Sequence, residues 1–360
     1  MSRILILANN SDGLYGFRRE LIAHLARENA VFASTPNDGY FDELRALGCT
    51  VIETPIDRRG INPVTDGKLL LRYMKLLRQV KPDLVITYTI KPNVYGGMVC
   101  RLLGVPYATN ITGLGTAFQK KGALRTLVTV LYKMALKRAQ VVFFENAGNR
   151  DTLIGEGIVR EAQCRLLMGA GVNLAHYVPA EYPAEEPVQF LFIGRVMREK
   201  GVEELFSAME RLRGEGYGCV LNVVGGYEED YEPIIRAHEA AGWLRYHGYQ
   251  KDVRPFIAQS HCFVLPSYHE GMANTNLECA AMARPLITSR IPGCMEAVEE
   301  GVSGYLCAAQ DAESLYTEMK RFLALAAEER AEMGRAGRRR MEAAFDKEKV
   351  VDATVEGLGV

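Results

Sequence analysis

The sequence lacks long apolar runs and paired cysteine motifs. Its apolar stretches fall far short of the roughly 18 residues that a membrane-spanning helix needs. The eight cysteines are scattered with no Cys-x-x-Cys pair, so the ligand spacing of a structural zinc site is absent. The apolar run at residues 4–8 is too short for a signal peptide and predicts a first strand. We therefore expect reduced thiols and a cytoplasmic protein.

Acidic residues are missing from one long part of the chain. No Asp or Glu lies between Asp83 and Glu145, while eight Lys and Arg residues do. Residues 1–175 carry 23 basic and 14 acidic side chains, whereas residues 176–360 carry 20 and 30. A basic half predicts an anionic partner: a membrane surface, a phosphorylated substrate or a nucleic acid. Nucleic acid is disfavoured, because no recognised binding motif accompanies the charge.

Short apolar runs alternate with helical periodicity along the 360 residues, of which 48% are apolar and 24% charged. This pattern predicts a folded α/β protein of about two domains with parallel sheets. Pro179, Pro183 and Pro187 interrupt the alternation, which then restarts. We expect domains at residues 1–175 and 188–340, a linker at 176–187 and a helical terminus at 341–360. Two parallel sheets facing each other imply a cleft, with ligands at the carboxyl ends of the strands.

The stretch Phe192-Ile-Gly-Arg-Val-Met-Arg-Glu-Lys-Gly201 is the first candidate site. A predicted strand ends at Gly194, a short loop carries Arg195 and Lys200, and Gly201 opens a helix. Two cations beside a helix amino terminus suit a diphosphate. A solvated basic turn that caps the helix is the alternative interpretation.

The second candidate site is His269-Glu-Gly-Met-Ala-Asn-Thr-Asn-Leu-Glu278. Glu270 lies in the loop before a predicted helix and Glu278 lies about two turns inside it, so the two carboxylates can hold opposite ends of one ligand. Carboxylates accept hydrogen bonds from the vicinal hydroxyls of sugars and ribose. Two ordinary surface glutamates are the alternative, which Gly271 and the apolar surroundings disfavour. Backbone N–H groups are available for a phosphate at Met272, Ala273 and Asn274.

Three glycines near the ends of two early strands point to a second ligand region. Gly13 and Gly16 flank the start of the first helix and allow a phosphate to approach the backbone, which makes Arg18 a candidate phosphate ligand. A surface arginine is the alternative for Arg18. Thr112 and Gly113 begin a glycine-rich loop that we expect to shape the acceptor side. A dinucleotide fingerprint is disfavoured there, because Phe118 stands in place of its third glycine.

A predicted amphipathic helix at residues 119–138 is the candidate membrane contact. One arc holds Leu124, Leu127, Val128, Leu131, Met134 and Ala135. The other side carries Lys121, Arg125, Lys133 and Lys137, with Lys120 just before them. Such a helix can lie on an anionic membrane. An ordinary helix with its apolar side in the core is the alternative.

Together, Gly-Arg-x-x-x-x-Lys-Gly and Pro-Ser-Tyr-x-Glu-Gly-x(6)-Glu resemble the family 4 retaining glycosyltransferases of the GT-B fold. The resemblance covers essentially the whole chain, including the restart after the linker and the loop Ile291-Pro-Gly-Cys-Met-Glu296. More narrowly, Tyr15-Gly-Phe-Arg18 and Thr112-Gly-Leu-Gly115 are similar to bacterial transferases that extend undecaprenyl diphosphate-linked sugars. The resemblance implies two Rossmann-like βαβ domains facing across a cleft, with a terminal helix that returns to the amino-terminal domain.

The resemblance also implies roles for the matching residues. Arg195 and Lys200 would neutralise the leaving diphosphate, Glu278 would hold the ribose and Glu270 the donor sugar. It implies no cofactor and no metal, in keeping with the lack of an Asp-x-Asp motif in this sequence. Many relatives carry a His in the amino-terminal domain, whereas this chain has Asn110 and Thr112 near that position.

The leading hypothesis is a retaining transferase that moves a hexose or N-acetylhexosamine from a UDP-sugar to a polyprenyl diphosphate-linked saccharide. We expect it to make cell-surface glycans as a peripheral protein on the inner face of the plasma membrane. A UDP-sugar epimerase of the same fold and a non-catalytic nucleotide-sugar-binding protein remain the alternatives.

Overall fold

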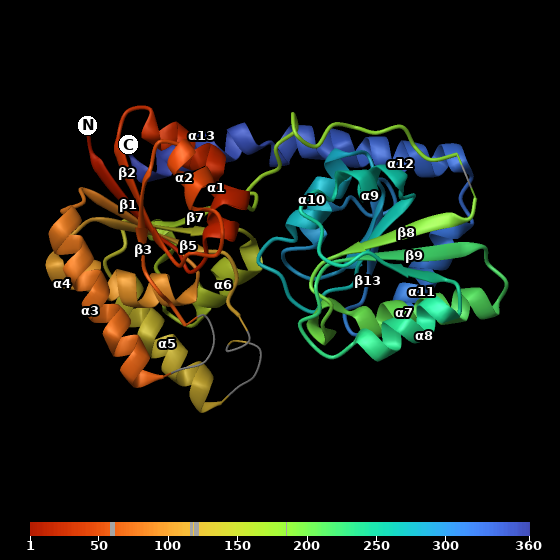
Figure 1. Cartoon of the computed structure of the whole chain (residues 1–360), viewed down its shortest axis with the longest axis horizontal. Helices are drawn as coiled ribbons and strands as arrows, with labels where there is room; N and C mark the ends of the chain where they lie inside the picture. The colour runs from red at the N-terminus through yellow and green to blue at the C-terminus, as the bar shows by residue number, and fades with distance from the viewer. Residues whose placement is uncertain (58–61, 116–117, 119–121, 185) are drawn as a thin grey trace. The chain divides into compact units, whose positions relative to one another are not determined.

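The computed structural model describes residues 1–57, 62–115, 118, 122–184 and 186–360 (Figure 1). Its contacts divide the chain into two units. Unit 1 comprises Met1–Ala170 and Glu348–Val360, and unit 2 comprises Gly171–Lys347. The predicted boundaries at residues 175 and 340 therefore differ from the observed ones, and the expected linker at 176–187 belongs to unit 2. Each unit contains one parallel sheet, as the alternation of strands and helices predicted.

The seven-stranded sheet of unit 1 has the order β3-β2-β1-β4-β5-β6-β7. Its strands are β1 (Arg3–Leu7), β2 (Ala30–Thr35), β3 (Thr50–Glu53), β4 (Leu84–Tyr88), β5 (Tyr107–Ile111), β6 (Val141–Phe144) and β7 (Cys164–Leu166). Its helices are α1 (Ser11–Ala26), α2 (Phe41–Ala46), α3 (Pro63–Val80), the π-helix η1 (Pro92–Gly96), α4 (Gly97–Leu103), α5 (Ala123–Leu136), α6 (Ala147–Gly155) and the short η3 (Glu161–Gln163). The strand order reverses between β1 and β4, where such sheets bind ligands.

The six-stranded sheet of unit 2 has the order β10-β9-β8-β11-β12-β13 and reverses between β8 and β11. Its strands are β8 (Val188–Ile193), β9 (Cys219–Val224), β10 (Leu244–Tyr246), β11 (Cys262–Leu265), β12 (Leu286–Ser289) and β13 (Gly304–Cys307). The helices before the carboxy-terminal segment are η4 (Arg198–Lys200), α7 (Val202–Gly214), α8 (Glu232–Ala240), α9 (Arg254–Gln259), α10 (Asn274–Ala281), η5 (Met295–Ala297) and α11 (Ala312–Leu323). The segment that follows is α12 (Ala327–Arg340), η6 (Met341–Phe345) and α13 (Lys347–Leu358).

Both faces of each sheet are covered by helices, as expected for buried parallel strands. In β1, Ile4 and Ile6 pack on the side of α1, while Leu5 and Leu7 pack on the side of α3 and α5. This alternation follows from the two-residue period of a strand. The whole predicted run at residues 4–8 is therefore core, which agrees with its prediction as a strand.

The carboxy-terminal segment, whose last part was predicted as a helical terminus at residues 341–360, is not one helix. A π-helical turn, η6, separates α12 from α13. At this break, the backbone of Val172 forms hydrogen bonds with the backbone of the carboxy-terminal segment. Beyond it, Val350, Val351 and Leu358 belong to the core of unit 1, on the α1 side of the sheet.

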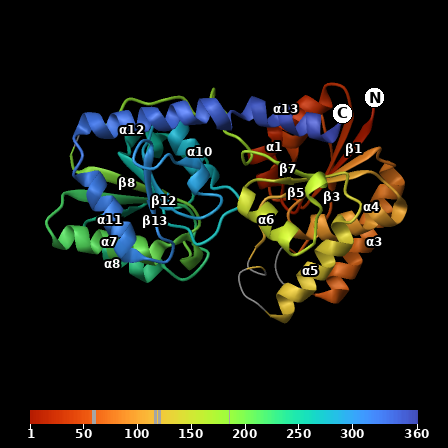
Figure 2. The same cartoon turned by 180° about the vertical axis from the view of Figure 1, so that it is seen from behind.

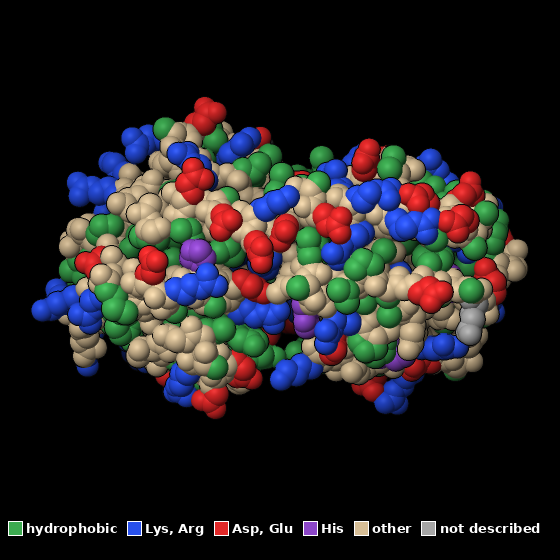
Figure 3. Space-filling model, turned by 90° about the horizontal axis from the view of Figure 1, so that it is seen from above, with side chains coloured by type: hydrophobic (Ala, Val, Ile, Leu, Met, Phe, Trp, Pro, Cys, Tyr) green, Lys and Arg blue, Asp and Glu red, His purple; other side chains and the backbone are tan. Residues whose placement is uncertain are grey.

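On α12, Arg335 and Arg339 both pair with Glu332. Basic and acidic side chains are interspersed over this face of the molecule (Figure 3).

The eight cysteines are all buried and unpaired. Burial raises the pKa of Cys49 and Cys219 to about 11, so these thiols stay protonated at neutral pH.

Among the described helices, none is both long and apolar enough to cross a bilayer.

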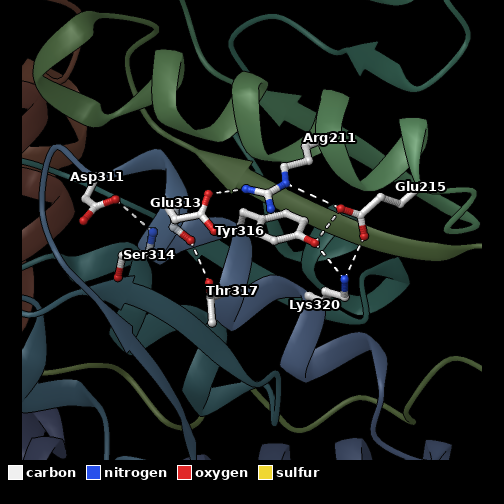
Figure 4. Close-up of polar contacts among 8 residues, drawn as sticks. All are labelled: Arg211, Glu215, Asp311, Glu313, Ser314, Tyr316, Thr317 and Lys320. Atoms are coloured by element: carbon white, nitrogen blue, oxygen red, sulfur yellow. Dashed lines mark hydrogen bonds and ion pairs between the residues drawn. The ribbon is translucent and has the colours of Figure 1, made fainter.

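Helix α7 is held against α11 by a polar network (Figure 4). Glu215 accepts hydrogen bonds from Tyr316 Oη and Lys320 Nζ, each at 2.7 Å. The guanidinium of Arg211 pairs with Glu313 and lies 3.7 Å from the centre of the Tyr316 ring. Because α7 begins directly after Gly201, this network fixes the helix that follows the first candidate loop.

Arg284, which follows α10, is completely buried and has no acidic partner among the hydrogen bonds of its guanidinium. Burial lowers its pKa to about 10. Its three nitrogens donate to six backbone carbonyls, which belong to Ala180, Glu181, Ile257, Ala258, Met282 and Ala283. One side chain thereby joins the segment before β8, the end of α9 and the end of α10.

We predict that Arg284→Met lowers the free energy of unfolding by about 3 kcal/mol or more, because buried carbonyls would lose their donors. Arg284→Lys should recover only part of this, since an ammonium cannot reach the same set of carbonyls. Urea unfolding of the whole chain measures the effect. Arg236→Met, at an exposed position on α8, is the control and should change stability little. Equal stability of Arg284→Met and wild type would contradict the prediction.

Candidate functional site

The two candidate loops of unit 2 follow β8 and β11, the strands at which the sheet order reverses. Gly201 has a φ of +73°, and a Cβ there would lie 2.1 Å from the carbonyl oxygen of Pro266. Only glycine fits this position, because backbone and not a movable side chain fills the space. The Tyr268 N–H also donates to the Glu199 carbonyl at 2.9 Å. The two sequence motifs are therefore parts of one site.

Lys200 and Glu270 form the centre of this site. The Lys200 Nζ lies 2.5 Å from Glu270 Oε1, and the two side chains are only 20% and 12% exposed. Sequence reasoning assigned them separately, to a diphosphate and to a sugar. The pairing leaves the ammonium with donors for an anion and the carboxylate with acceptors for hydroxyl groups. A solvated basic turn is therefore the wrong interpretation for Lys200.

Arg195 is more exposed than Lys200 and has a different partner. Its side chain is 56% exposed, and its guanidinium lies 3.3 Å from Glu228 Oε2. The next acidic residue, Glu229, accepts a hydrogen bond from the Arg198 N–H at 2.7 Å. Sequence reasoning missed this loop after β9. The signal was the acidic run at residues 228–230, which begins four residues after the end of β9.

The start of α10 differs from the expectation in one respect. The Ala273 N–H donates to the Gly293 carbonyl at 2.7 Å, so this group is not available to a phosphate. The reason is the loop after β12, where Gly293 has a φ of +89° and a Cβ would meet the Gly271 carbonyl at 2.7 Å. Met272 and Ala273 are buried, and Asn274 Oδ1 is buried without a hydrogen-bond partner among the described residues.

Two further predicted donor-side residues are Gly194 and Glu278, and Glu278 lies one turn inside its helix rather than the predicted two. Gly194 directly follows β8, and its N–H donates to the Val224 carbonyl of β9. Glu278 is half-buried on α10, one turn after Asn274. Burial lowers the pKa of His269, which precedes Glu270, so its imidazole is neutral at pH 7. Within the described parts of the chain, no three His, Cys, Asp or Glu side chains gather as metal ligands do.

In unit 1, Arg18 forms a buried ion pair with Glu145, at the carboxyl end of β6. The Arg18 guanidinium lies 5.0 Å from the centre of the Tyr88 ring, and burial raises the pKa of that tyrosine. Arg18 is only 8% exposed, so it is not the surface arginine of the alternative interpretation. Glu145 was missed as a site residue, although it ends the stretch without acidic residues.

The start of α1 already holds a carboxylate. Asp38 Oδ1 accepts hydrogen bonds from the N–H groups of Ser11 and Asp12, at 2.8 and 3.3 Å. The N–H groups at this helix terminus are therefore already bonded within the chain. A phosphate that approached beside Gly13 and Gly16, as expected, would find them occupied.

The loop after β5 carries the other residues predicted for the acceptor side. Thr112 and Gly113 are half-buried and follow β5 directly, with Gly113 in a positive-φ conformation. Residues 116, 117 and 119–121 lie outside the described residues, and with them the predicted membrane contacts Lys120 and Lys121.

Comparison with known proteins agrees with this geometry. Residues 3–146 match the family described as "Glycosyl transferase 4-like", and residues 178–340 match "Glycosyl transferases group 1". One relative is N,N'-diacetylbacillosaminyl-diphospho-undecaprenol alpha-1,3-N-acetylgalactosaminyltransferase of Campylobacter jejuni, 27% identical over 87% of both chains. Another is UDP-Gal:alpha-D-GlcNAc-diphosphoundecaprenol alpha-1,3-galactosyltransferase of Escherichia coli, 25% identical over 73% of this chain and 72% of that protein.

A solved structure of HepE from Anabaena, in complex with UDP and glucose, has the same fold. It superposes with a TM-score of 0.81 over the full length of both chains, at 16% sequence identity. The family matches cover both units, and the paired loops lie at the strand ends where this fold holds its ligands. The chain belongs to the glycosyltransferases of the two-domain GT-B fold.

Proposed function

We propose that the protein is a retaining, metal-independent glycosyltransferase that moves a hexose or N-acetylhexosamine from a UDP-sugar to a polyprenyl diphosphate-linked saccharide. The observation that carries the proposal is the Lys200–Glu270 pair, which places a cation and a hydroxyl-binding carboxylate in one half-buried site. The names of the Campylobacter and Escherichia coli relatives support the acceptor class. The UDP in the HepE complex supports the donor class.

In this proposal, unit 2 stabilises the departing nucleotide. As the bond between the sugar and UDP breaks, negative charge grows on the diphosphate, and Lys200 and Arg195 neutralise it. Glu270 orients Lys200 and accepts hydrogen bonds from the sugar hydroxyls, while Glu278 holds the ribose. Gly194, Gly271, Met272, Ala273 and Asn274 form the walls of the donor site, with Ala273 acting through packing since its N–H is bonded.

Unit 1 supplies the acceptor side, with Arg18, Thr112 and Gly113 at the carboxyl edge of its sheet. Gly13 and Gly16 are not included, because Asp38 already occupies the helix start that they flank. Arg18 would reach an acceptor phosphate while Glu145 holds its guanidinium in place. A lipid-linked acceptor requires a peripheral position on the inner face of the plasma membrane. The lack of acidic residues between Asp83 and Glu145 supports that position.

Transfer activity separates this proposal from its alternatives. We expect the purified chain, given a radiolabelled UDP-sugar and an undecaprenyl diphosphate-linked saccharide, to release UDP and label the lipid. A screen of UDP-hexoses and UDP-N-acetylhexosamines then identifies the donor. An isomerised nucleotide sugar would indicate an epimerase, and binding without turnover would indicate a non-catalytic protein. The anomeric configuration of the product, determined by NMR, tests retention.

Lys200→Ala and Arg195→Ala should each lower turnover by about 10²–10³-fold, because each removes a charge from the departing diphosphate. Both chains should remain folded by circular dichroism. Arg236→Ala, which removes an exposed arginine of unit 2 outside the donor loops, is the matched control and should keep full activity. Near-normal turnover of both loop variants would overturn the donor-site assignment.

Activity should survive removal of divalent metal, because Arg195 and Lys200 provide the positive charge that a metal ion would otherwise supply. The test is to measure transfer activity after dialysis of the protein against EDTA. Complete loss of activity that manganese or magnesium restores would contradict the proposed mechanism.

A further inference from the structure

Part of one sheet face in unit 2 is polar. Gln189 of β8, Asn222 of β9 and Arg245 of β10 lie on neighbouring strands. His261 comes directly before β11, and its N–H donates to the Gln189 carbonyl at 2.8 Å. Buried parallel strands usually carry apolar side chains on both faces. The four side chains instead line one groove on the sheet.

The groove has a volume of about 740 Å³, which lies within the roughly 300–1,000 Å³ of small-molecule sites. One wall is the segment before β8, with Tyr182, and the other is α9, with Phe256. The described residues that line the groove include none from the loops at 194–201 and 266–278. The groove is therefore separate from the candidate site at the carboxyl ends of β8 and β11.

Two arginines hold the walls of this groove in place. The guanidinium of Arg284 donates to four carbonyls on the two walls, at Ala180, Glu181, Ile257 and Ala258. The segment before β8 runs along α12 in Figures 1 and 2, where Arg338 donates to the Tyr177 carbonyl at 2.8 Å. Tyr182 Oη donates to the His261 carbonyl at 3.0 Å. These bonds fix the width of the groove before any ligand enters.

A chain of hydrogen bonds with one direction crosses the floor of the groove. Asn222 Nδ2 donates to Gln189 Oε1 at 2.9 Å, and His247 Nε2 lies 2.9 Å from Asn222 Oδ1. Because the Asn222 nitrogen bonds to Gln189, its oxygen accepts from His247, whose proton therefore lies on Nε2. Burial, together with Arg245, lowers the pKa of His247. The ring is thus neutral at pH 7, with Nδ1 as a hydrogen-bond acceptor.

The mixture of groups selects the kind of ligand. Glu181 and Glu186 line the groove together with Arg245, so an anion would meet two carboxylates. An apolar ligand would take water from the amides and the imidazole without replacing its hydrogen bonds. The hydroxyl groups of a saccharide both donate and accept, as this floor requires. The C–H face of a pyranose ring can pack on the rings of Tyr182 and Phe256.

We propose that the groove is a non-catalytic binding site for a short neutral oligosaccharide, formed by Tyr182, Gln189, Asn222, Arg245, His247 and Phe256. A saccharide bound there is not the donor sugar, because the groove shares no described residue with the loops of the candidate site. It would hold the protein on a glycan while the candidate site stays open. The inference goes beyond the proposed function and does not rest on it, since this binding needs no transfer.

Ligand-observed NMR titration of the whole chain tests the proposal without donor or acceptor. The probes are maltotriose, triacetylchitotriose and α-1,4-galactobiose, with inorganic phosphate as the comparison anion. At least one saccharide should bind with a Kd of about 1 mM or lower. Saturating UDP should leave this binding unchanged. Absence of binding by all three saccharides, binding of phosphate alone, or displacement by UDP would overturn the proposal.

Two variants assign the binding to the groove. Asn222→Leu should weaken it at least tenfold, because the change removes a donor and an acceptor and interrupts the chain from His247 to Gln189. Arg245→Met, at an exposed position of the groove, should weaken it about threefold or more and leave the fold unchanged. Arg236→Met, an exposed arginine of α8 that does not line the groove, is the matched control and should bind as wild type does.

Thermal unfolding of each variant shows whether it is folded, and Arg245→Met makes the test even if Asn222→Leu is not. Wild-type affinity of folded Arg245→Met, or equal loss in Arg236→Met, would overturn the proposal. Turnover of UDP-sugar and lipid-linked acceptor by Arg245→Met should equal that of wild type. A parallel loss of turnover would assign the groove to the catalytic site and overturn its non-catalytic role. Absence of turnover in wild type would count against the proposed function alone.

Discussion

The candidate site of unit 2 depends on the approach of the Gly201 backbone to the carbonyl of Pro266. This contact allows no side chain at residue 201 and joins the loop after β8 to the loop after β11. Lys200 precedes Gly201 and Glu270 follows Pro266, so the backbone contact places their side chains within hydrogen-bonding distance. The glycine of the first motif is therefore a geometric requirement of the ion pair.

A second close backbone contact joins the loop after β12 to the loop after β11. Gly293 lies against the Gly271 carbonyl and provides the acceptor for the Ala273 N–H. Three loops that are far apart in the sequence thus form one rigid wall at the carboxyl edge of the sheet. Such preorganisation matters for electrostatic catalysis, because donors that are already oriented need no rearrangement when charge develops.

Charged side chains are paired differently in the two units. In unit 1, Glu145 pairs with the buried Arg18, while α4 and α5 carry basic residues and no acidic ones. In unit 2, basic residues at the surface pair with nearby acids, as on α12 and between α7 and α11.

The sequence by itself determined the fold class and the two candidate loops of unit 2. The period of its apolar runs specified two parallel sheets, and the spacing of Gly194, Lys200, Gly201 and Glu270 identified strand-end loops, because both signals depend only on local geometry. Tertiary structure decided which groups pair. The Lys200–Glu270 contact and the bonding of the Ala273 N–H depend on loops that meet only after the sheet has formed. The same holds for α5: its sequence predicts an amphipathic helix, but its neighbours in the sheet and in α4 decided which apolar residues are buried and which remain exposed.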